Sequence, residues 1–154
     1  MSWTVLGAFF ALNFAAASAG ALFKPGTWYE TLSKPSWTPP NWAFPVVWLA
    51  LFIMNAVAGA LVWQAGGMGL AIGVYVISLA INFAWSGLFF GARRMDLALI
   101  DVSALWLSIA ATIVLFWPIS PQASLLQVPY LIWVTIAAAL NLRVMQMNPR
   151  ATAD

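Results

Sequence analysis

The stretch that decides the fold is residues 42–63, WAFPVVWLALFIMNAVAGALVW. It contains no charged side chain, and about 20 apolar residues suffice for a helix to cross the roughly 30 Å hydrocarbon core of a bilayer. Pro45 lies in the expected first turn, where its missing N–H removes no helical hydrogen bond. The stretch therefore predicts a membrane-spanning helix.

Four further apolar runs accompany this stretch. The chain has 154 residues, of which 64% are apolar and 6% charged, whereas about one-quarter of the residues of a soluble domain are charged. This composition excludes a soluble globular protein. We expect a single membrane domain over residues 1–154, an all-α integral membrane bundle of five transmembrane helices with an ordered loop, residues 24–41, between helices 1 and 2. The polar tail from Asn148 to Asp154 is expected to fray. The expected spans are residues 5–23, 42–63, 69–90, 97–117 and 125–146.

The basic residues are confined to one side of this arrangement. An odd number of spans places the first loop, the third loop and the C-terminus on the same face, and all six basic residues fall there. The positive-inside rule then predicts a cytoplasmic C-terminus and an outward N-terminus, without saying which membrane holds the chain. Because the charges are scattered along the sequence, they form no patch for nucleic acid. The residues are Lys24, Lys34, Arg93, Arg94, Arg143 and Arg150.

Missing residue types exclude several kinds of chemistry. With no His and no Cys, the chain lacks imidazole and thiolate ligands, thiol nucleophiles and catalytic triads. The four carboxylates, Glu30, Asp96, Asp101 and Asp154, are too scattered for a metal site, so we expect no metal, no obligatory cofactor and no conventional catalytic constellation. An ion-coupled exporter of cationic drugs needs a carboxylate inside the membrane. Only Asp101 lies inside a span, close enough to the arginines of the third loop to pair with them, which argues against this class.

Small residues form a stripe along one face of the third span. They recur at intervals of three, four or seven positions, and two G-x-x-x-G pairs lie among them. In lipid, such a stripe lets helix backbones approach closely. The stripe packs either on a helix of the same bundle or on its own copy in a homodimer through helix 3. Its members are Gly69, Gly73, Ala80, Ala84, Gly87 and Gly91.

Aromatic and amide residues share other faces of the spans. An asparagine in hydrocarbon needs a hydrogen-bond partner, so Asn13, Asn55, Asn82 and Asn141 are expected to point into the bundle, either toward other helices or toward a ligand. The tryptophans among these residues lie deeper than the interfacial aromatic belt, which favours a ligand. The stripes are Trp48, Phe52 and Asn55 in the second span, Asn82, Trp85 and Phe89 in the third, and Trp133, Ala137 and Asn141 in the fifth.

The first loop has an unusual composition for a linker. Residues 23–41 read FKPGTWYETLSKPSWTPPN, with four prolines and three aromatic residues after Phe23. Proline restricts the backbone and aromatic side chains favour burial, so the loop is expected to fold back as a lid over the basic-side mouth of the bundle. A lid implies a cavity beneath it.

These motifs together resemble a known family. The pattern begins with Trp28-Tyr29-x-x-Leu32-x-Lys34-Pro35-Ser36-Trp37-x-Pro39-Pro40-x-Trp42, continues with Asn82-Phe83-Ala84-Trp85 and Phe89-Phe90-Gly91-Ala92-Arg93, and ends with Pro129-Tyr130-Leu131-x-Trp133 and Leu140-Asn141. It spans nearly the whole chain and is similar to that of the tryptophan-rich sensory proteins related to the mitochondrial translocator protein, once called the peripheral benzodiazepine receptor; the chain looks like a bacterial member. The resemblance implies a five-helix bundle, commonly dimeric, that binds porphyrins in a pocket under the first loop.

The resemblance also implies site residues and further ligands. Cholesterol-like lipids and synthetic aromatic drugs are ligands of some members, but this chain has Leu142 where the family's C-terminal sterol motif has a tyrosine, which weakens the expectation of a sterol. Lid positions carried over from the family are Trp37 and Trp42. The pocket positions carried over are Tyr29, Pro39, Trp48, Asn82, Trp85, Trp133 and Ala138, and the stripes described above add Phe52, Phe89, Ala137 and Asn141.

Two functions follow from these observations. The favoured one is a membrane receptor or carrier for a flat, hydrophobic, acidic ligand such as metal-free protoporphyrin, in tetrapyrrole transport or sensing. Tryptophans would stack on the ring, and Lys or Arg at the mouth would meet its propionates. The alternative, which the resemblance implies for some members, is a light-dependent porphyrin-degrading enzyme with Trp48 or Trp133 as the electron partner.

Overall fold

The computed structural model describes residues 2–23, 26–66 and 68–151. Every regular element in this part of the chain is helical. Five stretches are long and apolar enough to cross a membrane, which confirms the five predicted spans. The stretches are Trp3–Leu22, Ala43–Gly66, Leu70–Gly91, Met95–Phe116 and Pro121–Met147.

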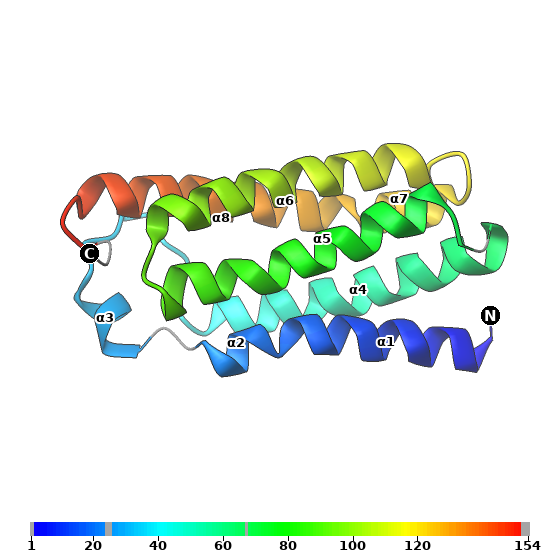
Figure 1. Ribbon diagram of the computed structural model, residues 1–154, viewed down its shortest axis with the longest axis horizontal. Helices are drawn as coiled ribbons and strands as arrows, with labels where there is room; N and C mark the ends of the chain where they lie inside the picture. Colours follow the sequence, from blue (N-terminus) through cyan, green and yellow to red (C-terminus); the bar gives the residue numbers. More distant parts are fainter. Residues whose placement is uncertain (1, 24–25, 67, 152–154) are drawn as a thin grey trace.

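Several of these spans are divided into two helical segments. The helices are α1 (Trp3–Ala17), α2 (Ala19–Leu22), α3 (Gly26–Thr31), α4 (Ala43–Gly66), α5 (Leu70–Ser86), the π-helical turn η1 (Gly87–Gly91), α6 (Met95–Phe116), α7 (Pro121–Leu126) and α8 (Val128–Met147). They form an elongated bundle, with the N-terminus at one end and α3 and the C-terminus at the other (Figure 1). The turn from η1 to α6 and the end of α8, which carry most of the described basic residues, lie at the end that holds α3.

The local causes of the breaks can be identified in the sequence. Pro129 has no N–H to donate to the carbonyl of Leu125, so α7 and α8 meet at a turn. At η1 the amide of Ala92 donates to the carbonyl of Gly87 over 2.7 Å, five residues back, which widens the turn. Arg93 follows with a φ of 55°, in the left-handed region that ends a helix.

The fifth span begins at Pro121, earlier than the predicted start near residue 125. Ser120 caps this helix, because its hydroxyl oxygen accepts a hydrogen bond from the Ala123 amide over 3.3 Å. Proline suits the first helical position, since its fixed φ matches the helix and no hydrogen bond is lost there. Proline also ends helices, so Pro121 by itself does not indicate that a span begins there.

The outer surface of the bundle is apolar and its interior contains amides. Ile100, Leu107 and Val114 on α6 are largely exposed, as expected for a surface in contact with lipid. All four asparagines that were predicted to point inward are buried, which confirms that prediction: Asn13, Asn55, Asn82 and Asn141.

A buried polar network joins the first, second, third and fifth spans. Nδ2 of Asn13 on α1 donates to the Tyr75 hydroxyl on α5 over 2.7 Å, and that hydroxyl donates to the backbone carbonyl of Asn55 on α4 over 2.7 Å. Nδ2 of Asn55 donates to Oδ1 of Asn13 over 2.7 Å, and Nε2 of Gln127 donates to Oδ1 of Asn55. Because these groups satisfy one another, the network is stable in a low-dielectric interior.

The helices approach closely next to this network. A Cβ atom placed on Gly59 of α4 would lie 2.6 Å from Cδ1 of Phe9 and 2.7 Å from Cζ of Tyr75. Only glycine therefore lets α1, α4 and α5 pack at this distance. The bundle is tightly packed at this level, which lies beyond the inner end of the cavity described next.

Candidate ligand site

A cavity of about 740 Å³ lies at the end of the bundle that holds α3. Its walls come from the end of α1, α2, α3, the first turns of α4, the end of α5 and η1. Small residues of α1 and α2 leave room for it, and eight aromatic side chains line it. These are Phe14, Phe23, Tyr29, Phe44, Trp48, Phe52, Trp85 and Phe90.

The cavity also presents a few polar groups. Asn82 donates through Nδ2 to the Tyr130 hydroxyl, which fixes the amide and leaves its carbonyl oxygen without a partner among the described residues. Ser86 adds a hydroxyl group to the lining. An apolar wall with a few convergent polar groups is typical of a small-molecule site.

A second, much smaller cavity of about 30 Å³ adjoins the first and shares Tyr29, Trp48 and Trp85 with it. Trp133 from α8 closes this space, and its ring centroid lies 6.4 Å from that of Trp48, with the two rings nearly perpendicular. The Trp133 indole nitrogen is buried and has no partner among the described residues.

The structure places the predicted site residues in three groups. Tyr29, Trp48, Phe52, Asn82 and Trp85 line the large cavity. Phe89, Trp133, Ala137 and Asn141 line the small one, together with three of the first group. Trp37 and Trp42 are 49% and 70% exposed, Pro39 and Ala138 are half-buried, and all four lie outside both linings, so their ligand roles stay predictions.

Several lining residues were not predicted from the sequence. Phe23, Phe44 and Phe90 line the large cavity, as do Glu30 and the small residues around Gly20. The signal that could have indicated them is the run AAASAGA at residues 15–21, because side chains this small in the first span leave space beside it. Neighbouring aromatic residues then complete the wall.

The lid packs onto the bundle through Tyr29 of α3. Its buried ring lies edge-on to Phe90, with 5.5 Å between centroids, and also contacts Phe89. Lys34 places Nζ 4.6 Å from the centroid of the same ring. Burial raises the pKa of the Tyr29 hydroxyl above its usual value of 10.0. The lid thus folds back as the sequence predicted; Lys24 and Pro25, at its start, lie outside the described residues.

The C-terminal segment holds the lid in place. Oδ1 of Asn148 accepts a hydrogen bond from the Ser33 amide over 2.9 Å, and its Nδ2 donates to the Ser33 carbonyl over 2.7 Å and to the Val144 carbonyl over 2.8 Å. Nε1 of Trp28 donates to the Ala151 carbonyl over 3.3 Å. The expectation that the tail frays from Asn148 onward was therefore wrong for residues 148–151, because their polar groups pair with the lid.

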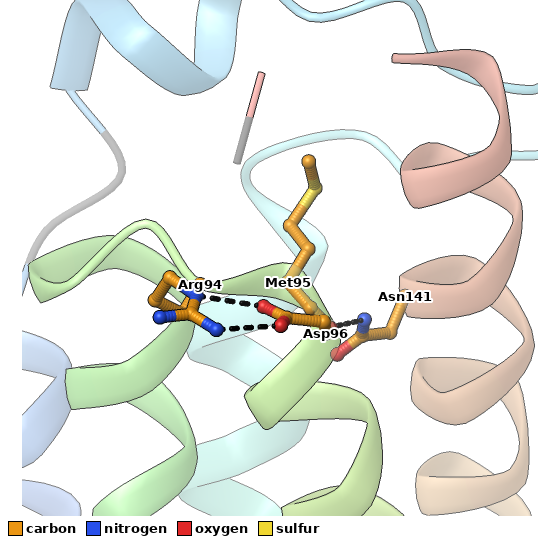
Figure 2. Close-up of polar contacts among 4 residues, drawn as sticks. All are labelled: Arg94, Met95, Asp96 and Asn141. Atoms are coloured by element: carbon orange, nitrogen blue, oxygen red, sulfur yellow. Dashed lines mark hydrogen bonds and ion pairs between the residues drawn. The ribbon is translucent and has the colours of Figure 1, made fainter. Parts of the chain in front are cut away.

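Asn141 connects three elements behind the cavity. Its Nδ2 donates to the Met95 carbonyl at the start of α6 over 2.9 Å (Figure 2). Its Oδ1 accepts a hydrogen bond from Nε1 of Trp85 over 3.0 Å. Both polar atoms are engaged, so Asn141 orients the Trp85 ring and holds α8 against α6.

The two acidic residues of α6 have different surroundings. Arg94 and Asp96 form an exposed pair of 2.7 Å, in which both carboxylate oxygens accept hydrogen bonds (Figure 2). The pairing with Arg93 or Arg94 that the position of Asp101 allowed is not found among the described residues. Oδ2 of Asp101 is buried without a partner among the described residues, and Asp101 lines neither cavity.

The small-residue stripe of the third span is only partly covered. A Cβ atom on Gly91 would lie 2.8 Å from the ring of Phe23, and one on Gly87 would lie 3.4 Å from the same ring, so these two glycines pack within the chain. Beside Gly69 and Gly73 a Cβ atom would meet no other heavy atom within 4 Å. Ala80 is exposed and Ala84 is half-buried. The homodimer interface stays a prediction, and the residues of the stripe that are open to a second copy are Gly69, Gly73 and Ala80.

Fold and site together define a class: a five-span helical membrane protein with an aromatic-lined cavity beneath a lid in its first loop. Sequence comparison identifies the family within that class. The model of the TspO/MBR family matches residues 8–147. The chain therefore belongs to the TspO/MBR family.

Relatives from bacteria and mammals share this similarity. Protein CrtK of Rhodobacter capsulatus is 41% identical over 155 residues, covering 97% of this chain and 96% of the relative. The tryptophan-rich sensory protein of Cereibacter sphaeroides is 43% identical over 148 residues, covering 96% and 94%. The translocator protein of Homo sapiens is 40% identical over 126 residues, covering 79% and 75%.

Proposed function

We propose that the protein is a membrane receptor or carrier that binds porphyrins of the protoporphyrin type, and other flat hydrophobic aromatic molecules, in the large cavity. The observation that carries the proposal is the cavity itself, about 740 Å³ walled by eight aromatic side chains. This volume falls in the range of about 300–1,000 Å³ that is typical of small-molecule sites. Aromatic rings stack on a planar tetrapyrrole and shield its apolar body from water.

The donor set favours a metal-free ring over haem. Haem iron needs an axial ligand such as His, Cys, Met or Tyr. The described lining contains no His, Cys or Met, and its one tyrosine, Tyr29, belongs to the lid. The polar side chains of the inner wall, Asn82 and Ser86, suit hydrogen bonding better than iron ligation.

The names of the relatives support a role in sensing or translocation. One relative is called a sensory protein and another a translocator protein. For this chain we propose tetrapyrrole transport or sensing, with synthetic aromatic drugs as further ligands. A cholesterol-like lipid is the weaker candidate, because Leu142 replaces the tyrosine of the sterol motif and lies exposed on α8.

Tryptophan substitution tests the site directly. Trp48→Leu and Trp85→Leu should each weaken protoporphyrin binding about two- to ten-fold, the loss expected for one aromatic contact. Trp3→Leu is the matched control, because Trp3 is 85% exposed at the other end of the bundle. Binding is followed through porphyrin absorbance in nanodiscs. Equal affinities in all three variants and the wild type would place the ligand elsewhere.

A second candidate function is light-dependent porphyrin degradation with dioxygen as the oxidant. It is favoured by the contacts of Trp48, which lines the cavity and lies 6.2 Å from Tyr130 and 6.4 Å from Trp133 between ring centroids. These oxidisable side chains form a continuous group next to the ligand space. Illuminating the complex should then give a new absorbing product whose rate falls in Trp48→Phe and Trp133→Phe. Bleaching at the same rate without protein would refute this function.

The proposed assembly and orientation can be tested in the same membranes. A homodimer through α5 should be weakened by Ala80→Leu and by Gly73→Leu, because bulky side chains would separate the two stripes. Gel filtration with light scattering in detergent reports the mass of the assembly.

The proposed orientation is tested separately. Labelling of cysteines introduced at residues 3 and 150 in cells reports whether the N-terminus is outward and the C-terminus cytoplasmic.

A further inference from the structure

Part of the rim of the large cavity lies inside the membrane-spanning stretches. On the first span Phe14 lines the cavity and is 44% exposed, and Gly20 and Ala21 also line it and are exposed. On α4 the same holds for Pro45 and for Leu49, which is 52% exposed. The cavity is therefore open on the side of the bundle, along a slit between the first span and α4.

A break in the first span accounts for the slit. Ser18 separates α1 from α2, and its hydroxyl donates to the Ala15 carbonyl over 2.6 Å, a kind of local hydrogen bond that often bends helices. On one side of this break α1 packs along α4, and on the other side α2 packs on α5. The first span thus moves away from α4 toward the end of the bundle that holds α3, and the cavity lies where the two separate.

The slit faces lipid over much of its length. Leu49 lies six residues into α4, which is about 9 Å along the helix axis at about 1.5 Å per residue. Phe14 lies eight residues before the end of α2 at Leu22, about 12 Å by the same measure. At these depths the surroundings of a membrane-spanning bundle are acyl chains.

The chemistry of the slit and of the wall behind it suits hydrocarbon. The exposed lining residues on the two sides of the slit have apolar side chains or none, and aromatic rings line most of the wall behind them. An apolar cavity does not hold water well, because water finds few hydrogen-bond partners there. A flexible apolar chain instead gains dispersion contacts with the wall. A cavity that is open to the bilayer core is therefore expected to take up hydrocarbon.

We propose that the large cavity is a binding site for one acyl chain of a membrane phospholipid, which enters through the slit between the first span and α4. The headgroup of this lipid stays at the level of the lid, where the rim of the cavity includes the exposed polar residue Asn41. The site goes beyond the proposed function, since it requires only the cavity and its rim. A porphyrin that binds in the same cavity must displace the chain, so the two ligands compete.

Photo-crosslinking from the lipid tests the site. Nanodiscs are made with a phosphatidylcholine that carries a diazirine in the middle of one acyl chain, the full chain is illuminated in them, and the labelled residues are identified by mass spectrometry. Phe52 reports on the cavity, because its side chain is buried and lines it. Phe9 is the internal reference, because it is also buried but lies outside both cavity linings.

A pair of glycine variants tests the slit itself. A Cβ atom on Gly20 would meet no other heavy atom within 4 Å, so Gly20→Phe has room to place its ring in the opening. Gly7→Phe is the matched control, because Gly7 lies on the same span in equally open surroundings and lines neither cavity.

Phe52 should be labelled well above Phe9 in the wild type and in Gly7→Phe, and Gly20→Phe should lose most of that label. Protoporphyrin at about ten times its dissociation constant should lower the label on Phe52 about ten-fold, because it then occupies about nine-tenths of the sites. Label on Phe52 no higher than on Phe9, or equal label in the two glycine variants, would overturn the proposal. Strong label on Phe52 that protoporphyrin leaves unchanged would support the lipid site and contradict the proposed porphyrin site.

Discussion

Replacing Asn148 with alanine should release the lid from the C-terminal end of α8. Asn148 makes two hydrogen bonds to the Ser33 backbone, of 2.9 and 2.7 Å, in an exposed setting. At the lower part of the usual range, about 0.5–1 kcal/mol each, their loss amounts to about 1–2 kcal/mol. Since about 1.4 kcal/mol is a factor of ten, the open lid should become about 5–30 times more populated.

Amide hydrogen exchange of residues 26–33, followed by mass spectrometry in nanodiscs, measures this opening. Asn148→Ala should speed exchange in α3 and at Ser33 by the factor given above. Asn148→Asp keeps the oxygen that accepts from the Ser33 amide but loses both donations, so it should fall between wild type and alanine. Gln146→Ala is the control, because its side chain contacts only Arg143 among the described hydrogen bonds. Wild-type exchange rates in Asn148→Ala would mean that other contacts, such as the burial of Tyr29 and the hydrogen bond from Trp28 to Ala151, hold the lid.

Three further predictions concern packing, orientation and pH. Gly59→Ala should lower the thermal unfolding midpoint, because its Cβ would overlap two aromatic rings at a cost of about 1–3 kcal/mol; Gly7→Ala, where a Cβ meets nothing within 4 Å, should not. Asn141→Ala should free the Trp85 indole and weaken protoporphyrin binding, and unchanged affinity would show that the ring is held by packing alone. Burial raises the pKa of Tyr29. The stability that its buried, neutral hydroxyl contributes is therefore complete below pH 10.0 and is lost as the pH rises from there through the folded-state pKa. Tyr29→Phe should remove that alkaline part of the pH profile of thermal unfolding; an unaltered profile would assign it to another group.

The spans and much of the cavity wall could be predicted from the sequence because both depend on local pattern. Residues 42–63 are apolar for long enough to need a bilayer, whatever they pack against. Trp48 and Trp85 were expected to face inward because they lie below the interfacial belt, and both line the cavity. The lid was expected because its prolines and aromatic residues fit a packed segment better than a linker.

The remaining features depend on contacts between distant parts of the chain. Ser33 and Asn148 are 115 positions apart, and a polar residue in a C-terminal tail gives no sign that it will pair with a loop. Gly87 and Gly91 have the spacing of a helix-packing motif, yet they bound a π-helical turn and accommodate the Phe23 ring. In the sequence Glu30 looks like an ordinary solvated loop charge, and only the fold of α3 makes it part of the cavity lining.

The buried polar network of Asn13, Tyr75, Asn55 and Gln127 closes the bundle beyond the inner end of the cavity. A molecule that crossed the whole bilayer through the bundle would have to separate the four spans that carry these residues. Each polar group left without a hydrogen-bond partner in the apolar interior would cost about 1–3 kcal/mol. None of these four residues lines the cavity, so exchange of a bound molecule on the lid side would leave the network intact.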